Sequence, residues 1–226
     1  MIAQPQTFEL LEVRVGRPRI IGKDGRGRPI WSSINRRKVR GRHVYVTWAG
    51  TAGDQVTESR LRPEAGPGGE TRFNQIHGGP NKAIYVYPSE HYARWLGELS
   101  ETGSWRFLRR FRLDRLGIGR RSFGENWRVR GITEAQVHIG DAWQIGQVIV
   151  RVSRVRTPCT TLATYYGDKS IIKRMKGNGM CGWYLEVVQP GAMPTAGTIQ
   201  VLEVHPEAQT VSELFAELMN TAGPAA

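Results

Sequence analysis

The residues best suited to chemistry lie between Arg151 and Leu162, where the chain reads R-V-S-R-V-R-T-P-C-T-T-L. Val148, Val150, Val152 and Val155 alternate with polar or charged residues at a period near two, which predicts a half-buried strand that ends at the Thr157-Pro158 turn. Because Pro158 cannot donate a hydrogen bond to a sheet, the strand should stop there and present Cys159 just beyond its end. Three arginines stand close behind this thiol and should lower its pKa: Arg151, Arg154 and Arg156. Cys159 is therefore either a reactive thiol, which acts as a nucleophile or a metal ligand, or a buried structural cysteine without a chemical role.

The length and the cysteine content set the class of protein. A chain of 226 residues can bury a core without covalent cross-links. Its two cysteines, Cys159 and Cys181, do not make a disulfide framework, which indicates a reducing compartment. The N-terminus lacks the features of a signal peptide and no stretch has the length of a membrane span. We therefore expect a cytoplasmic protein with no membrane partner.

The net charge of +12 is concentrated in three segments. Residues 14–42 carry nine arginines and two lysines against one acidic residue, and residues 106–130 carry nine arginines against two acidic residues. Residues 151–176 hold seven basic residues and one acidic residue. Such segregation predicts a positive face and an anionic partner, which could be nucleic acid, a phosphorylated cofactor or an acidic protein. The excess of arginine over lysine favours bidentate contacts to phosphate or carboxylate.

The pattern of apolar residues predicts many short strands and few helices. The pattern indicates strands at 8–15 (with a bulge near Leu11), 43–48, 83–87, 127–129, 136–139, 183–188 and 198–204, and a strand pair at 143–155 that is broken at Gly146. Asp24-Gly25 is a hairpin signal. Between Gly50 and Phe73 the composition shifts to glycine, proline, threonine and glutamate, and residues 63–70 are expected to form a long loop. Helices are expected at 89–99, at 168–177 with Gly177 as its C-terminal cap, and at 211–220 behind a capping box at Thr210. No repeat or boundary divides the chain, so we predict one mostly β barrel, decorated by helices, over residues 1–226.

Two further motifs could bind a ligand. In His77-Gly78-Gly79-Pro80 the glycines allow backbone N–H groups to form an anion-binding nest, with Lys82 as an added donor, although a tight turn explains them equally well. Asn126, in Phe123-Gly124-Glu125-Asn126, either contacts a ligand or forms an Asx-type hydrogen bond within its own turn. Cys181 is flanked by apolar residues, which favours burial in the core. The spacing of the two cysteines is not that of a zinc site. Arginines interleaved with aromatic residues are typical of RNA-binding surfaces, so RNA binding by the barrel is a further alternative.

Taken together, these stretches resemble the MOSC domain, the molybdenum cofactor sulfurase C-terminal domain, in its stand-alone bacterial form. The matching stretches span about residues 8–204 and include A-G-D-Q at 52–55, H-G-G-P-N-K-A-I-Y-V-Y-P-S-E-H-Y at 77–92, F-G-E-N at 123–126, I-G-D at 139–141, V-S-R-V-R-T-P-C at 152–159 and G-W-Y at 182–184. The resemblance implies a β-barrel of the pyruvate kinase barrel type, with a core at about 8–204 and a C-terminal helix at about 211–220.

The resemblance also implies a chemistry. Cys159 takes the place of the family cysteine, which either carries a transferred sulfur or coordinates the molybdenum of a pterin cofactor. Cofactor-loaded stand-alone relatives reduce N-hydroxylated compounds such as hydroxylaminopurines, with electrons from a flavin-dependent reductase. Molybdopterin carries a phosphate, which suits an arginine-rich pocket, and a thiolate is a suitable soft metal donor.

Our hypothesis is a molybdenum-cofactor-binding protein that acts on a small-molecule substrate. Cys159 is its metal ligand, Arg156 supports the thiolate or the cofactor phosphate, and five further residues line the pocket: His77, Gly78, Gly79, Lys82 and Asn126. The first alternative is a sulfur carrier with a persulfide on Cys159, loaded by a cysteine desulfurase that binds pyridoxal phosphate. The second is a nucleic-acid-binding barrel without catalysis.

Three departures from the family pattern concern the choice of substrate. Asn81 stands where an acidic residue is usual, and Trp127 stands where an aliphatic residue is usual. The stretch between Thr57 and Gln75 resembles an insertion ahead of the H-G-G-P loop.

Overall fold

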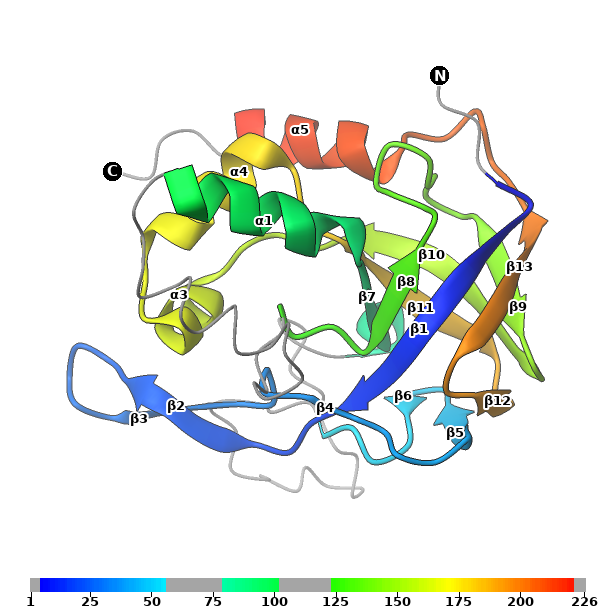
Figure 1. The fold of residues 1–226 in the computed structure, drawn as a ribbon, viewed down its shortest axis with the longest axis horizontal. Coiled ribbons are helices and arrows are strands. Elements are labelled where there is room, and N and C mark those ends of the chain that lie inside the picture. Colours follow the sequence, from blue (N-terminus) through cyan, green and yellow to red (C-terminus); the bar gives the residue numbers. More distant parts are fainter. Residues whose placement is uncertain (1–4, 56–78, 102–122, 222–226) are drawn as a thin grey trace, which may run out of the picture.

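The structure is a computed structural model that describes residues 5–55, 79–101 and 123–221. Seven strands build its main sheet: β1 (Thr7–Val15), β7 (Ile84–Pro88), β8 (Trp127–Arg130), β9 (Ala142–Ile145), β10 (Val148–Val155), β11 (Trp183–Gln189) and β13 (Gly197–Glu203). They run in the order β13-β9-β10-β11-β7-β8-β1, and pairing of β1 with β13 closes the barrel (Figure 1). The β7–β8 pair is parallel and the others are antiparallel. The expected mostly β barrel is confirmed.

Alternation along β10 explains how the sequence specifies this strand. Val148, Val150 and Val152 are buried, whereas Arg151 between them is exposed. A period of two puts alternate side chains on opposite faces of a strand, so the valines fill the barrel. The strand ends at Val155, immediately before the predicted turn. In β1 the pairing with β8 shifts between Leu10 and Glu12, which confirms the expected bulge.

Shorter strands lie outside the barrel. β2 (Arg19–Lys23) and β3 (Pro29–Ser32) form a separate hairpin, in which the Asp24 carboxylate accepts the backbone N–H groups of Arg26 and Arg28 at 2.9 Å each. β4 (Arg37–Lys38) extends the main sheet beside β1. A three-stranded sheet contains β5 (His43–Thr47), β6 (Gly50–Thr51) and β12 (Gly191–Pro194). The hairpin is confirmed, whereas β12 was not predicted.

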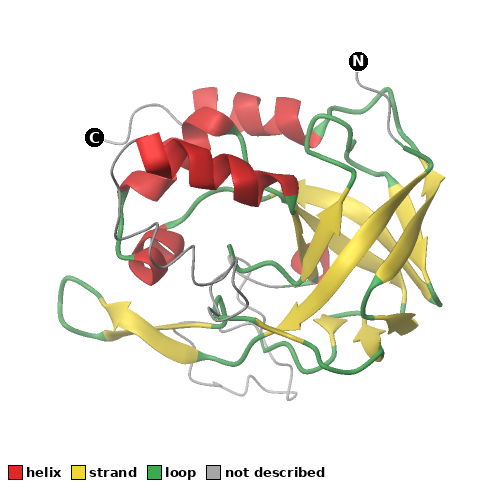
Figure 2. Cartoon of the chain, in the orientation of Figure 1, coloured by secondary structure: helices red, strands yellow, loops and turns green. Residues whose placement is uncertain are grey.

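The helices gather on one side of the barrel (Figure 2). They are α1 (Glu90–Glu101), α3 (Thr160–Tyr166), α4 (Ser170–Asn178) and α5 (Val211–Thr221). The short 3-10 helix η1 (Pro80–Lys82) lies apart from them, beside β10 and β11. Trp95 of α1 donates its indole N–H to the hydroxyl of Tyr87 in β7 at 2.8 Å. The capping box of α5 is present, because Thr210 Oγ1 accepts the N–H of Glu213 at 3.1 Å and the Glu213 carboxylate accepts the N–H of Thr210 at 2.8 Å.

Four sequence expectations were wrong in detail. Residues 136–139 are not a strand but make one isolated bridge, because the Asp141 carboxylate holds the His138 N–H at 2.7 Å and turns the chain. Helix α3 was not predicted. Helix α4 runs through Gly177 and ends at Gly179, whose φ of 68° suits the left-handed cap. Strand β5 stops at Thr47, and Trp48 lies exposed beyond it.

Two segments discussed above fall outside the described residues: most of the glycine- and proline-rich loop with its insertion, and the arginine-rich stretch around 105–119. In the described ranges, every helix is too short or too polar to cross a membrane.

Candidate functional site

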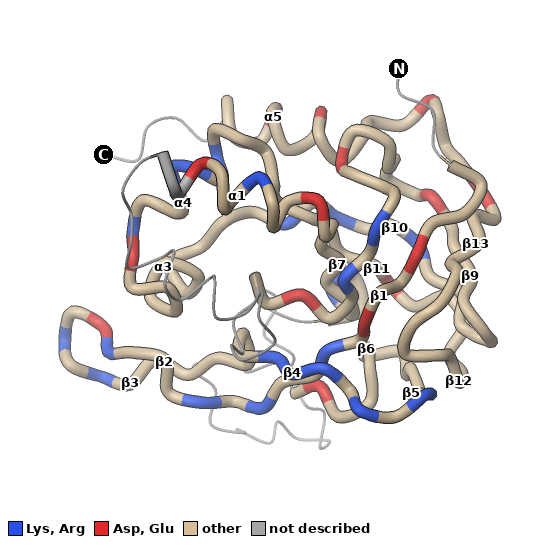
Figure 3. The backbone as a smooth tube through the Cα atoms, in the orientation of Figure 1, with Lys and Arg blue, Asp and Glu red and all other residues tan. Residues whose placement is uncertain are grey.

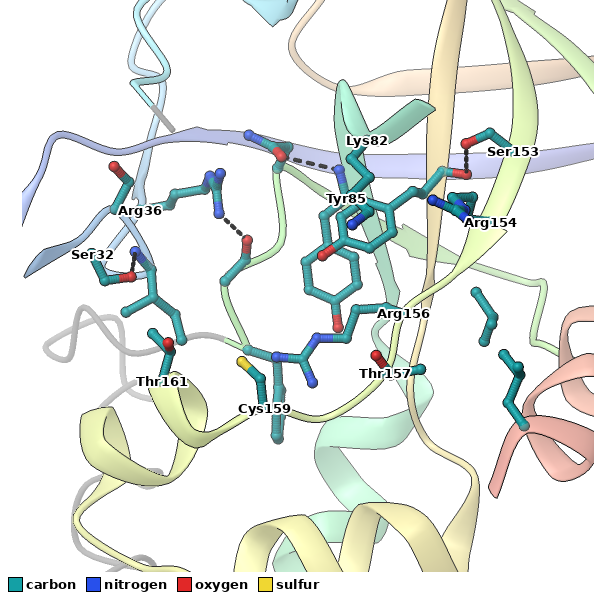
Figure 4. Close-up of a pocket in the computed structure, with 18 of the residues that line it drawn as sticks. Ser32, Arg36, Lys82, Tyr85, Ser153, Arg154, Arg156, Thr157, Cys159 and Thr161 are labelled. Carbon is teal, nitrogen blue, oxygen red and sulfur yellow. Dashed lines mark hydrogen bonds between the residues drawn. The ribbon is translucent and has the colours of Figure 1, made fainter. Parts of the chain in front are cut away.

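A cavity of about 510 Å³ opens between the end of β10, the β2–β3 hairpin and the start of α3. Figure 4 shows the side chains that line it. They come from the segments 31–36, 82–85, 123–126 and 153–161, together with Tyr184 of β11 and two leucines of α5. Barrel closure brings these segments together although they are distant in the sequence.

Cys159 lies where β10 gives way to α3. Its backbone is extended, its carbonyl accepts the N–H of Leu162 at 3.0 Å, and its side chain makes no capping hydrogen bond with the helix. The residue is half-buried and its thiol lines the cavity (Figure 4). The thiol is therefore positioned to bind a group inside the cavity.

Arg156 is the buried cation beside this thiol. Its Nη1 donates to the sulfur of Met175 at 3.3 Å, and its guanidinium lies 5.7 Å from the ring centre of Tyr85. Burial acts to lower the pKa of Arg156, but Coulombic interactions, first with Tyr85 and then with Cys159, raise it above its ordinary value. Among the described residues no carboxylate forms an ion pair with Arg156, although its side chain is 95% buried. A buried guanidinium of this kind calls for an anion.

Two more basic residues line the cavity, whereas a third points away. Lys82 ends helix η1, and burial together with the neighbouring Arg154 lowers the pKa of its amine. Arg154 is exposed and also lines the cavity. Arg151 pairs with Glu186 at 3.4 Å on the outside of the barrel. Two of the three arginines that precede Cys159 thus add positive charge to the cavity.

Asn126 lies at the cavity wall, but its amide is used within the protein. Its Oδ1 accepts the N–H of Tyr85 at 3.0 Å, and its Nδ2 donates to the Asp54 carboxylate at 2.9 Å. The amide therefore joins distant segments and does not close a local turn. Gly124, two residues earlier, has a φ of 91°, and a Cβ there would stand 2.9 Å from Ile34. Glycine lets this loop pass close to the cavity wall.

Sequence reasoning missed a clamp at the opposite wall. Arg36 lines the cavity, donates from Nε and Nη2 to the two oxygens of Asp54 at 2.9 and 2.8 Å, and donates from Nη1 to the carbonyl of Gly124. The Asp54 carboxylate also accepts the N–H of Gly16 at 2.7 Å. Asp54 lies in the A-G-D-Q stretch, but nothing in the basic segment 14–42 distinguishes Arg36 from its eight fellow arginines.

The H-G-G-P stretch is described only in part. His77 and Gly78 lie outside the described residues. Gly79 has a φ of 101° and its carbonyl accepts the N–H of Lys82 at 2.9 Å, which makes the turn into η1. Gly79 itself is not among the residues that line the cavity.

Cys181 is fully buried, as its apolar neighbours indicated. Burial, and then the nearby Glu134, raise the pKa of its thiol well above the ordinary value. In the described part of the chain, no cluster of three or more histidine, cysteine or acidic residues could hold a metal ion.

Comparisons with known proteins identify the family and the fold. The family model of the MOSC domain matches residues 74–203. The uncharacterized protein YflK of Bacillus subtilis is 34% identical over 126 residues, which cover 56% of this chain and 50% of YflK. Protein YiiM of Escherichia coli is 30% identical over 149 residues, which cover 66% of this chain and 61% of YiiM. A Gibberella moniliformis protein named reductase is 28% identical over 200 residues, or 88% of this chain and 30% of that protein.

The matches therefore span half to three fifths of the two bacterial relatives and under a third of the fungal one. The crystal structure of YiiM from Escherichia coli has the same fold, with a TM-score of 0.65 and 23% identity, over 98% of this chain and 81% of YiiM. The family model matches more than half of the chain, and the matched part includes Cys159. This chain therefore belongs to the MOSC domain family.

Proposed function

We propose that this protein binds the molybdenum cofactor, a molybdopterin, in the cavity, with Cys159 as a metal ligand, and that it reduces N-hydroxylated compounds. The observation that carries the proposal is one cavity in which an uncapped thiol stands beside a buried guanidinium that no carboxylate among the described residues neutralises. MOSC domains are associated with the molybdenum cofactor in general, and a fungal relative carries the name reductase.

The donors in the cavity fit an anionic group with a soft metal. A thiolate suits molybdenum, and a guanidinium binds oxyanions in bidentate fashion. Lys82 has a lowered pKa because burial and Arg154 disfavour its charge, and a phosphate beside it would reverse that penalty. An anionic ligand beside Lys82 would thus relieve an unfavourable interaction that the protein alone imposes on this amine.

Each residue then has a separate role. Cys159 would bind the metal, and Arg156 would hold the thiolate or the cofactor's anionic groups. Lys82 and Arg154, which also line the cavity, would contact the phosphate. Asn126 is a positioning residue, because its amide fixes Tyr85 and Asp54 and so shapes the wall.

The reaction takes up two electrons and two protons, breaks the N–O bond and releases an amine and water. A molybdenum cofactor held by Cys159 and Arg156 would supply the two electrons. A flavin-dependent reductase is the class of donor that we propose, because the fungal relative extends far beyond the part that matches this chain and is named a reductase.

The first test measures molybdenum and pterin in protein produced in a host that makes the cofactor. We expect about one molybdenum per chain in the wild type and loss of most of it in Cys159→Ala. Cys181→Ala is the matched control, because it removes the other thiol of the chain from a buried position outside the cavity. Its molybdenum content should equal that of the wild type.

Stoichiometric molybdenum in Cys159→Ala would contradict the role of this thiol. Absence of metal and pterin from the wild type would contradict cofactor binding. A gain of one sulfur atom on the Cys159 peptide, after incubation with a pyridoxal-phosphate desulfurase, would then support the sulfur-carrier alternative, for which neither the structure nor the relatives offer an observation.

A further inference from the structure

The rim of the cavity holds an aromatic side chain that the proposed function does not use. Trp31 of β3 lines the cavity, yet it is 43% exposed. Exposed apolar residues that occur singly need no explanation, and Trp48, with 60% exposure, is one of these because it does not line the cavity. Trp31 differs because its ring borders a ligand-sized space.

The β2–β3 hairpin that carries Trp31 packs against the helix that follows Cys159. Strand β2 lies so close to helix α3 that a Cβ on Gly22 would stand 2.6 Å from Thr164. Helix α3 begins directly after Cys159, and Trp31 and Cys159 line the same cavity.

Trp31 has an exposed apolar neighbour and borders a cavity with a cationic lining. Antiparallel pairing puts Trp31 opposite Ile20, on the same face of the hairpin, and Ile20 is 57% exposed. The same cavity is lined by Lys82, Arg154 and Arg156. An indole ring beside such a space offers a flat π-face on which a planar heteroaromatic ring stacks, whereas a small molecule without a ring gains nothing from it.

We infer that Trp31 forms an aromatic subsite that holds the flat ring of the substrate while its N-hydroxyl group faces Cys159. The inference rests on the proposed function and adds a residue that selects ring substrates. Trp31 is a specificity-determining residue, and the chemistry at Cys159 does not depend on it.

The test compares wild type, Trp31→Phe, Trp31→Ala and Trp48→Ala as cofactor-loaded proteins of equal molybdenum content. Binding of adenine, a purine ring without an N-hydroxyl group, is measured by calorimetry. We expect Trp31→Ala to weaken adenine binding about tenfold, in the range that loss of base–aromatic stacking causes, and Trp31→Phe to weaken it by less than about threefold. Trp48→Ala, which removes an exposed indole outside the cavity, should bind adenine like the wild type.

Activity gives an independent readout. For 6-hydroxylaminopurine, Trp31→Ala should raise KM by about the same tenfold with little change in kcat. For hydroxylamine, which has no ring, kcat/KM should stay at the wild-type value. Trp31→Phe keeps an aromatic ring, so it should retain the activity on 6-hydroxylaminopurine that Trp31→Ala loses. This result would show that the loss in Trp31→Ala comes from stacking and not from misfolding.

Three results would overturn the inference: no adenine binding by the wild type, equal binding by wild type and Trp31→Ala, or loss of molybdenum in Trp31→Ala, which would make the indole a cofactor contact. Failure of the proposed function looks different. If the wild type reduces neither compound but binds adenine through Trp31, the inference about the aromatic subsite is supported and the proposed reductase function is contradicted.

Discussion

Cys159 and Cys181 differ in what surrounds their sulfur atoms. Cys159 is half-buried at the cavity and makes no capping hydrogen bond, whereas Cys181 has no exposed surface. Burial and then Glu134 raise the pKa of the Cys181 thiol, which keeps it protonated in the folded state. Only one of the two thiols is therefore available for chemistry.

Alkylation with iodoacetamide tests this difference. At pH 8 the cofactor-free native protein should take one label, on Cys159, while Cys181 should react only after unfolding. The folded state binds the Cys181 proton more tightly than the unfolded state, so stability falls as pH rises above the unfolded thiol pKa of about 8.5. Labelling of Cys181 should accelerate above that pH, in step with unfolding measured by circular dichroism.

The native Cys159→Ala protein is the control and should take no label at pH 8. Labelling of Cys181 at the rate of Cys159 in the native wild type would show that the buried environment described here is wrong.

At the scale of elements, the cavity depends on contacts between loops that leave the barrel at one end. The Asp54 carboxylate ties together the end of β1 through Gly16, the segment before β4 through Arg36, and the segment before β8 through Asn126. Its side chain is 4% exposed, and that of Arg36 is 11% exposed. A buried ion pair of this kind holds its neighbours in one arrangement, and removal of one partner leaves the other charge buried without a counter-charge.

We expect Asp54→Ala to lower the free energy of unfolding by about 3–5 kcal/mol, because the Arg36 guanidinium then stays buried without a counter-charge. Urea unfolding of the cofactor-free protein measures this loss. Arg151→Ala is the control: it breaks the half-exposed pair with Glu186 and should cost less than about 1 kcal/mol. Equal costs for the two variants would show that the Asp54 clamp is not buried as described.

At the scale of the whole molecule, charge is distributed unevenly. Lysine and arginine follow one edge of the fold, from the β2–β3 hairpin past β4 to β5 (Figure 3). Most of them are exposed, including Arg19, Lys38 and Arg42, whereas Arg36 from the same segment turns inward. This edge is the physical basis of the nucleic-acid alternative, which no comparison supports.

Binding of a fluorescent 20-nucleotide single-stranded DNA tests that alternative. If the basic edge acts only as a charged surface, affinity should fall at least about tenfold between 50 and 200 mM salt, through counterion release, and Cys159→Ala should not change it. Tight binding that persists at 200 mM salt would contradict this expectation and would favour a dedicated nucleic-acid site.

Local chemistry made several features predictable from the sequence. The end of β10 before Thr157-Pro158, the Asp24-Gly25 hairpin and the capping box of α5 each depend on residues within a few positions of one another. The position of Cys159 beyond a strand end and the burial of Cys181 followed from the same local patterns.

The sequence by itself thus determined the strands of the barrel, the mostly β class and the cysteine at a strand end. Only the tertiary structure decided which arginines face the cavity, that Asn126 joins Tyr85 to Asp54, and that Trp31 stands at the rim. The physical reason is distance along the chain: residues 31, 126 and 159 are far apart in the sequence and border one cavity only in the folded chain. A local pattern contains no information about such contacts, since they are set by strand order and register.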